Sequence, residues 1–134
     1  MSKKKVYTTG ILNNQGSPLA NDTHIEVFNL GDYSHSVTVE VFNWDTAENG
    51  IGPGPTPIPV FHGTTFVQGN TVRLQPNRWV LFNAIVVGIT HYEVRITFHG
   101  DNIIANVFGR AFDGTAIAAQ SVLFSELVKV YLCD

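Results

Sequence analysis

The chain has 134 residues, enough for one domain with a sizeable core. Only 14% of its residues are charged and the net charge is −3; with Lys3, Lys4 and Lys5 set aside, the remaining basic residues are far outnumbered by the 11 acidic ones. This balance argues against nucleic-acid binding, which needs Lys and Arg clustered on a folded face. No run approaches the about 18 apolar residues of a membrane span and no segment resembles a signal peptide, so we expect a soluble protein that has no membrane partner and is not exported by the usual route.

The first element in chain order is Val6–Leu12, which has strand composition. A polar linker, Asn13–Ser17, and then Pro18 follow it. A strand on a flexible linker can pair within its own domain or complete the sheet of a neighbour, and the residues leave both arrangements open. We therefore divide the chain into an N-terminal arm and hinge, residues 1–17, and a single β-sandwich domain, residues 18–134.

The later segments alternate apolar and polar residues with period two and are rich in Val, Ile, Phe and Thr. The expected strands are Thr23–Leu30, Ser36–Trp44, Asn70–Pro76, Arg78–Val87, His91–Gly100, Asn102–Phe112 and Val122–Leu132. The stretch Ala116–Leu127 has helical propensity but no good cap, and we interpret it as strand as well. The pattern predicts an all-β, jelly-roll-like sandwich of about eight antiparallel strands with a short N-terminal extension.

One segment, Asn49–Val60, interrupts the strand pattern because it has prolines at 53, 55, 57 and 59. Proline has no N–H to donate to a sheet, so we expect an extended loop at the rim of the domain. We interpret this loop as a stiff connector rather than a ligand-binding loop.

The segment His91–Gly100 raises the question of chemistry, since His91, Glu93, Arg95, Thr97 and His99 share one face of the expected strand. His91 and His99 would lie roughly 26 Å apart along the strand, too far to hold one metal ion. No two of the five histidines are spaced as in the His-x-His pattern of cupins; they are His24, His35, His62, His91 and His99. We expect a solvated strand face, with no metal and no cofactor.

The remaining candidates for catalysis are also weak. The carboxylates Glu26, Glu40 and Glu93 fall on polar faces of separate strands, and no nucleophile or phosphate-loop motif is present. We expect no enzyme; a cupin-like metal enzyme is the third and weakest hypothesis. The second is a carbohydrate-binding or other recognition module, which would use exposed aromatic residues and the proline-rich loop. For that module, Trp44 is the expected exposed residue and Trp79 is expected in the core.

Four stretches of the chain carry a resemblance to known proteins: "TTGILNNQGSPLANDTHIEVFNLG", "VTVEVFNW", "HYEVRITFHGDNIIANVFGRAFDG" and "SELVKV". They resemble small β proteins of the spore surface of Bacillus-like bacteria, namely exosporium proteins and, more distantly, subunits of endospore appendages. The resemblance implies a jelly-roll subunit that polymerises or coats, in which an N-terminal extension inserts into a neighbouring subunit and sheets pair edge to edge. Carried over to this chain, the self-assembly arm would consist of Val6, Tyr7, Thr8, Thr9, Ile11 and Leu12.

The cysteine pattern departs from that family. Appendage subunits cross-link through cysteines in the N-terminal extension, whereas the single cysteine here is Cys133. That leaves an intersubunit disulfide through Cys133 as the one covalent link the chain offers.

The low charge of the strands supports self-association. Lys129 is the only lysine after residue 5, and soluble monomers commonly protect sheet edges with lysine. The expected function is therefore a structural, self-assembling subunit of a spore-surface fibre or layer, made in the mother cell, whose partners are copies of itself and other spore-surface proteins. It would polymerise by N-terminal strand donation and sheet-edge pairing.

Overall fold

The computed structural model describes residues 4–50 and 52–131, which form strands and two short 3-10 helices. The strands are β1 (Lys4–Thr8), β2 (Leu12–Asn13), β3 (Asp22–Asn29), β4 (His35–Asn43), β5 (Thr56–Ile58), β6 (Phe61–His62), β7 (Val67–Gln68), β8 (Thr71–Leu74), β9 (Arg78–Ile85), β10 (His91–His99), β11 (Ile103–Arg110), β12 (Ala116–Val122) and β13 (Val128–Val130). The helices are η1 (Asp45–Gly50) and η2 (Phe124–Glu126). Within the described residues, no helix has the length and apolar character that crossing a membrane requires.

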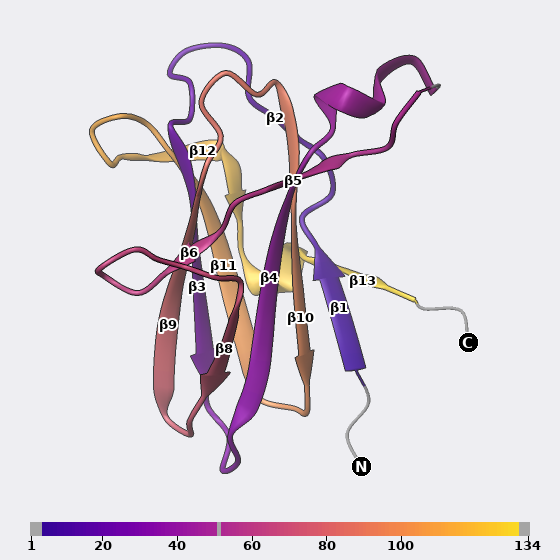
Figure 1. The fold of residues 1–134 in the computed structure, drawn as a ribbon. Coiled ribbons are helices and arrows are strands. Elements are labelled where there is room, and N and C mark those ends of the chain that lie inside the picture. Colours follow the sequence, from indigo (N-terminus) through magenta and orange to yellow (C-terminus); the bar gives the residue numbers. More distant parts are fainter. Residues whose placement is uncertain (1–3, 51, 132–134) are drawn as a thin grey trace.

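The strands form two antiparallel sheets that pack face to face (Figure 1). Sheet A has the order β13-β1-β10-β4-β5. In addition, β2 pairs with β10 along the same edge as β1, and β8 pairs with β4. Sheet B has the order β12-β11-β3-β9-β6-β7. The prediction of an all-β sandwich is confirmed. The strands outnumber the expected eight because β2, β5, β6, β7 and β13 are separate pieces of two or three residues.

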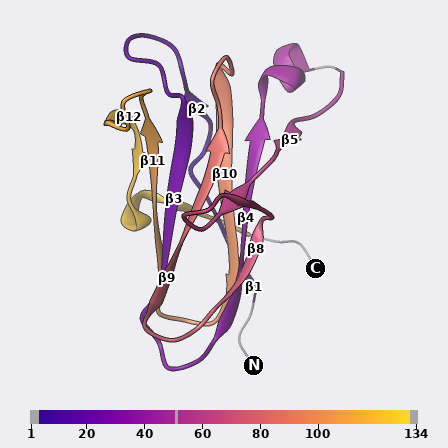
Figure 2. The same cartoon turned by 60° about the vertical axis from the view of Figure 1, so that its left-hand side comes forward.

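The chain crosses repeatedly between the two sheets, as the view in Figure 2 shows. The connections β3–β4, β8–β9, β9–β10, β10–β11 and β12–β13 all join strands of different sheets. Crossings of this kind bring sequence-distant strands side by side, as in the Greek-key arrangement of β-sandwiches. One consequence is that the C-terminal strand β13 lies beside the N-terminal strand β1.

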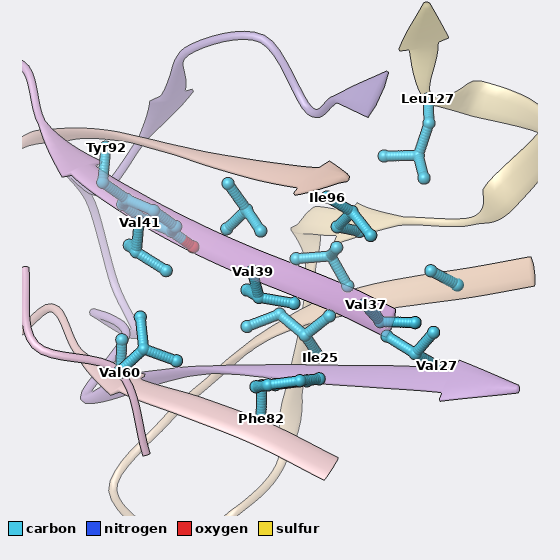
Figure 3. Packing of buried hydrophobic residues seen from close by; sticks show 14 of the residues in the cluster. Ile25, Val27, Val37, Val39, Val41, Val60, Phe82, Tyr92, Ile96 and Leu127 are labelled. Atoms are coloured by element: carbon cyan, nitrogen blue, oxygen red, sulfur yellow. The ribbon is translucent and has the colours of Figure 1, made fainter. Parts of the chain in front are cut away.

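The core lies between the sheets and is built from alternate residues of the long strands. Val37, Val39 and Val41 of β4 are buried, as are Ile25 and Val27 of β3. Figure 3 shows that Val39 and Ile25 point toward one another across the gap between the sheets. The side chains of a strand alternate between its two faces, so the residues between these buried ones lie on the outer faces of the sheets.

A buried polar network joins the N-terminal segment to the core. The Asn14 amide donates to the carbonyls of Ala20 (3.3 Å) and Val86 (3.2 Å), and its oxygen accepts from the side-chain amide of Gln120 at 3.1 Å. The Tyr92 hydroxyl donates to Gln120 Oε1 at 2.6 Å. Burial raises the pKa of Tyr92 above its usual range, which keeps the hydroxyl a donor. The network holds four segments of the chain together.

Two expectations about loops and strands need correction. The proline-rich segment does not lie wholly outside the sheets, since Thr56–Ile58 pairs with β4 as β5. This strand is at the edge of sheet A, the position where proline is tolerated because no further strand needs its N–H. The continuous strand expected over Val122–Leu132 is instead the end of β12, the helix η2 and the short β13, whereas the strand interpretation of the preceding residues from Ala116 is confirmed.

Candidate functional site

The two outer faces of the sandwich differ in chemical character. On sheet A the outward positions of the two central strands are mostly polar: Ser36, Thr38, Glu40 and Phe42 on β4, and His91, Glu93, Arg95, Thr97 and His99 on β10. On sheet B half of the outward positions of the three long strands are large and apolar: Phe28 on β3, Trp79, Leu81 and Ile85 on β9, and Ile104 and Phe108 on β11. We call the outward positions of β3, β9 and β11 the B face. An antiparallel sheet with one face on the core usually presents polar residues on the other, so the B face is the unusual one.

One end of the B face is aromatic. Trp79 and Phe28 occupy opposite positions on β9 and β3, and their rings stack with centroids 5.7 Å apart and planes 19° from parallel. Ile104 of β11 is the cross-strand partner of Phe28 on its other side. The side chain of Trp79 is 54% exposed, so this row presents a broad apolar surface to the outside.

At the middle and the other end of the B face, polar side chains bond to one another. Asp22 accepts hydrogen bonds from Arg110 Nη2 (2.7 Å) and Asn83 Nδ2 (2.6 Å), and His24 Nε2 lies 3.1 Å from Glu26 Oε2. Burial alone would raise the pKa of Asp22, but the hydrogen bonds from Arg110 and Asn83 outweigh it and hold that pKa below its usual value. Asp22 is therefore ionised, and the positive charge of Arg110 on the same face balances its charge.

A hollow of about 390 Å³ opens beside this polar group, at the same end of sheet B. Phe61, Phe66 and Ile85 supply its apolar walls, and Asn21, Asp22 and Asn83 complete the lining. Phe66 has a φ of 53°, a left-handed conformation that is rare for a bulky side chain. Its ring is 56% exposed.

The expected N-terminal arm lies within sheet A in this structure and does not project from it. The register of β1 on β10 runs from Lys4 opposite His99 to Thr8 opposite Arg95, and β13 covers the other edge of β1. Beyond Thr8, the backbone N–H of Thr9 donates to the carbonyl of Val94 at 3.0 Å. The arm is thus an internal strand of its own sheet.

The side chains of the arm also belong to the domain. Tyr7 stacks on Phe98 with ring centroids 5.6 Å apart, and Leu12 is part of the core. Val6 is buried outside the main core cluster, whereas Ile11 is about half exposed. The expected hinge is anchored too, because the Asn14 amide lies in the buried network described above. Burial of polar linker residues of this kind cannot be read from composition.

The prediction that the alternate residues of His91–His99 point outward is confirmed, but Glu93 is not a solvated charge. Its side chain is 4% exposed. It accepts hydrogen bonds from the Thr8 hydroxyl, from Trp44 Nε1 at 2.9 Å and from Arg95 Nε at 2.8 Å. Burial acts to raise the pKa of Glu93, but these three donors outweigh it and lower that pKa. Glu93 therefore ties β1, β10 and the residue that follows β4 together on the outer side of sheet A.

The five histidines lie on β3, β4, β6 and β10. His91 Nδ1 lies 3.0 Å from Asp45 Oδ1, and Asp45 also accepts from the backbone N–H groups of Thr90 and His91. Across residues 4–50 and 52–131, no three His, Cys, Asp or Glu side chains group in a way that would hold a metal ion. Cys133, the expected intersubunit link, lies outside the described residues.

The assignment of Trp79 was wrong, and Trp44 is less exposed than expected. Trp79, expected in the core, stands outward on β9, and Trp44, expected at the surface, is half-buried with its ring N–H bonded to Glu93. The run Arg78–Val87 is apolar on both faces, so alternation alone could not tell the inner from the outer residues. The pairing of Phe28 with Trp79 across β3 and β9 is the feature that sequence reasoning missed.

Comparisons with known proteins leave the family open. No model of a protein family and no curated protein matches the chain. A solved structure described as "Crystal Structure of Thermotoga maritima 1070" is similar at a TM-score of 0.42 and 10% sequence identity, over 96% of this chain and 90% of that one.

Proposed function

We propose that the protein is a structural β-sandwich subunit that associates with copies of itself through the B face, in a layer or fibre of a bacterial spore surface. The observation that carries the self-association is the apolar row Trp79, Phe28 and Ile104 at one end of the B face, with Trp79 exposed on a regular strand. An exposed apolar patch of this kind on a folded domain marks an interaction site. The spore-surface setting and the companion spore-surface proteins rest on the sequence resemblance.

The dimensions of the B face suit a stable contact. β3, β9 and β11 have 8 residues each. Strands of that length extend about 27 Å, and the three together with the 7-residue β12 are about 19 Å wide, which makes about 500 Å² per copy. Two such faces would bury about 1,000 Å², the lower limit for a specific interface.

The charges of the B face favour a second copy as the occupant. Its charged residues are Asp22, Glu26 and Arg110. Asp22 is bonded to Arg110 and Glu26 to His24 within one chain, so two B faces meet without a strong like-charge repulsion. Sheet-on-sheet packing at about 10 Å is also the way this domain builds its own core.

This proposal changes the expected mode of assembly. β1 is paired on both sides in its own sheet, so face packing replaces strand donation in the proposal. Edge pairing through sheet A has little support, because Lys129 lies in the middle of β13, Pro57 in β5 and Arg73 in β8, and such residues protect sheet edges. In sheet B the edge strand β12 carries no such residue, which leaves it as the edge open to pairing.

Sedimentation velocity and electron microscopy of the purified protein test the proposal. We expect wild type to associate as its concentration rises and Trp79→Lys to remain monomeric with an unchanged β circular dichroism spectrum. Ser36→Lys is the matched control, since Ser36 is an exposed outward residue of sheet A, and it should associate as wild type does. Monomers of wild type at every concentration, or equal loss of association in both variants, would overturn the proposal. Recovery of the protein in purified spore coats tests the location separately.

The stacked pair of Trp79 and Phe28 also favours a second function, recognition of carbohydrate, in which sugar rings stack on exposed aromatic side chains. Glycan binding by wild-type monomers that Trp79→Ala abolishes, without any self-association, would support this function over assembly.

A further inference from the structure

Phe112 is the most exposed large apolar side chain in the described part of the chain, at 86%. It stands in the turn between β11 and β12, which projects from the sandwich at the upper left of Figure 1. The turn is held by the backbone bonds Ala111 N–H to Thr115 O and Gly114 N–H to Ala111 O, both 2.9 Å. The Asp113 carboxylate adds a bond from the Thr115 N–H at 2.9 Å. These bonds order the backbone of the turn, and no residue in the described part of the chain covers the Phe112 ring.

The hollow on the B face has the chemistry to accept such a ring. Its walls are Phe61, Phe66 and Ile85, and aromatic rings favour tilted or offset contacts with one another. The hollow is open to the outside, and its volume of about 390 Å³ exceeds what one phenyl ring occupies.

Phe112 and the hollow lie at the same end of sheet B. Arg110, Asp22 and Ile85 form one cross-strand row on β11, β3 and β9, and Phe112 follows Arg110 by two residues. Ile85 and Asp22 line the hollow. Arg110 and Ile85 are therefore two strand spacings apart, or roughly 10 Å across the sheet, and the turn with Phe112 begins directly after Arg110.

A projection and a hollow at one end of the same sheet can engage reciprocally, because a twofold axis exchanges the two. We propose that two copies pair through their B faces about a twofold axis, with Phe112 of each copy in the Phe61–Phe66–Ile85 hollow of the other. This inference rests on the proposed function and specifies its contact. In each copy the Asp22–Arg110 ion pair lies beside the hollow, on the side of the Phe112 turn. Because its two charges already balance, the contact can cover the pair without burying an unpaired charge.

Disulfide trapping tests the geometry directly. In a Cys133→Ser background, Phe112→Cys combined with Ile85→Cys should give a covalent dimer on a non-reducing gel under mild oxidation, since the two positions would meet twice in each pair. Phe112→Cys combined with Leu30→Cys is the control; Leu30 is also exposed but follows the opposite end of β3. Each single cysteine variant shows the background of like-with-like bridges. A dimer yield no higher than in the control and the single variants would overturn the inference.

Alanine substitution tests the energetics. A well-buried aromatic anchor typically accounts for at least about a tenfold change in affinity, and the twofold pair contains the contact twice, so Phe112→Ala should weaken dimerisation about a hundredfold. Its urea unfolding midpoint should match that of wild type. Tyr131→Ala is the control, because Tyr131 is equally exposed but follows β13 of sheet A, and it should dimerise normally.

The outcomes separate this inference from the proposed function. If Phe112→Ala dimerises as wild type does while Trp79→Lys stays monomeric, the B face associates without the reciprocal contact and this inference alone fails. If neither substitution affects association, both fail.

Discussion

Leu12 and Ile11 are neighbours in the segment that composition assigns to an arm, yet they lie in different environments. Leu12 is part of the core in β2, opposite Tyr92 of β10, whereas Ile11 is about half exposed. Replacing each with alanine removes a side chain of similar size from adjacent positions. The pair therefore tests whether this segment folds into its own domain.

The expected effects differ several-fold. Leu12 is 7% exposed, and truncating a buried leucine to alanine typically lowers the free energy of unfolding by about 2–5 kcal/mol, from lost burial and the cavity left behind. Ile11→Ala removes a side chain that is largely in water already, so its effect should stay within about 0.5–1 kcal/mol.

Urea unfolding followed by circular dichroism measures both variants. The protein should be dilute enough to sediment as a monomer, because association stabilises the folded state by mass action. Equal unfolding free energies for Leu12→Ala and wild type would show that the segment does not contribute to the core of its own domain. That result would support an N-terminal arm that projects from the domain.

Two further predictions follow from the buried polar contacts. A Cβ added at Gly109 would lie 2.6 Å from Gln120 Cβ, so Gly109→Ala should lower the free energy of unfolding by about 1–3 kcal/mol through overpacking, as measured by thermal unfolding. Gly54→Ala is the control, because nothing lies within 4 Å of the added atom, and it should unfold like wild type. If Gly109→Ala also unfolded like wild type, the close packing of Gly109 against Gln120 would be refuted. The lowered pKa of Glu93 means that its ionised form stabilises the fold above the unfolded-state pKa of about 4.3, and that this contribution is lost as the pH falls through the lower folded-state pKa. Glu93→Gln should therefore show a shallower loss of stability than wild type in urea titrations from about pH 5 to pH 3, whereas parallel acid profiles would mean that the carboxylate is not bonded as described.

Much of the fold follows from the alternation of apolar residues. The segments of β3, β4, β9, β10 and β11 are predicted to within about two residues at each end, because each has a buried face and period two specifies it. The pairing partners are not local properties. Nothing in Val6–Leu12 indicates whose sheet it joins, and the bonds that anchor Asn14 come from residues up to 106 positions away.

The candidate site was harder to predict for a related reason. Sequence periodicity identifies an inner face by its contrast with a polar outer face, and β9 lacks that contrast since Val80 and Phe82 alternate with Trp79 and Leu81. Only the packing of β9 against sheet A determines which set faces outward. The burial of Glu93 likewise depends on hydrogen-bond donors from β1, from the residue after β4 and from β10 itself.

The most direct test of association through the B face is hydroxyl-radical footprinting of side chains at concentrations below and above the onset of association. The account predicts that Trp79 and Phe112 lose reactivity on association, while Tyr33, exposed in the turn between β3 and β4, and Phe42 on sheet A keep theirs. Unchanged labelling of Trp79, or protection centred on the outer residues of sheet A, would contradict it.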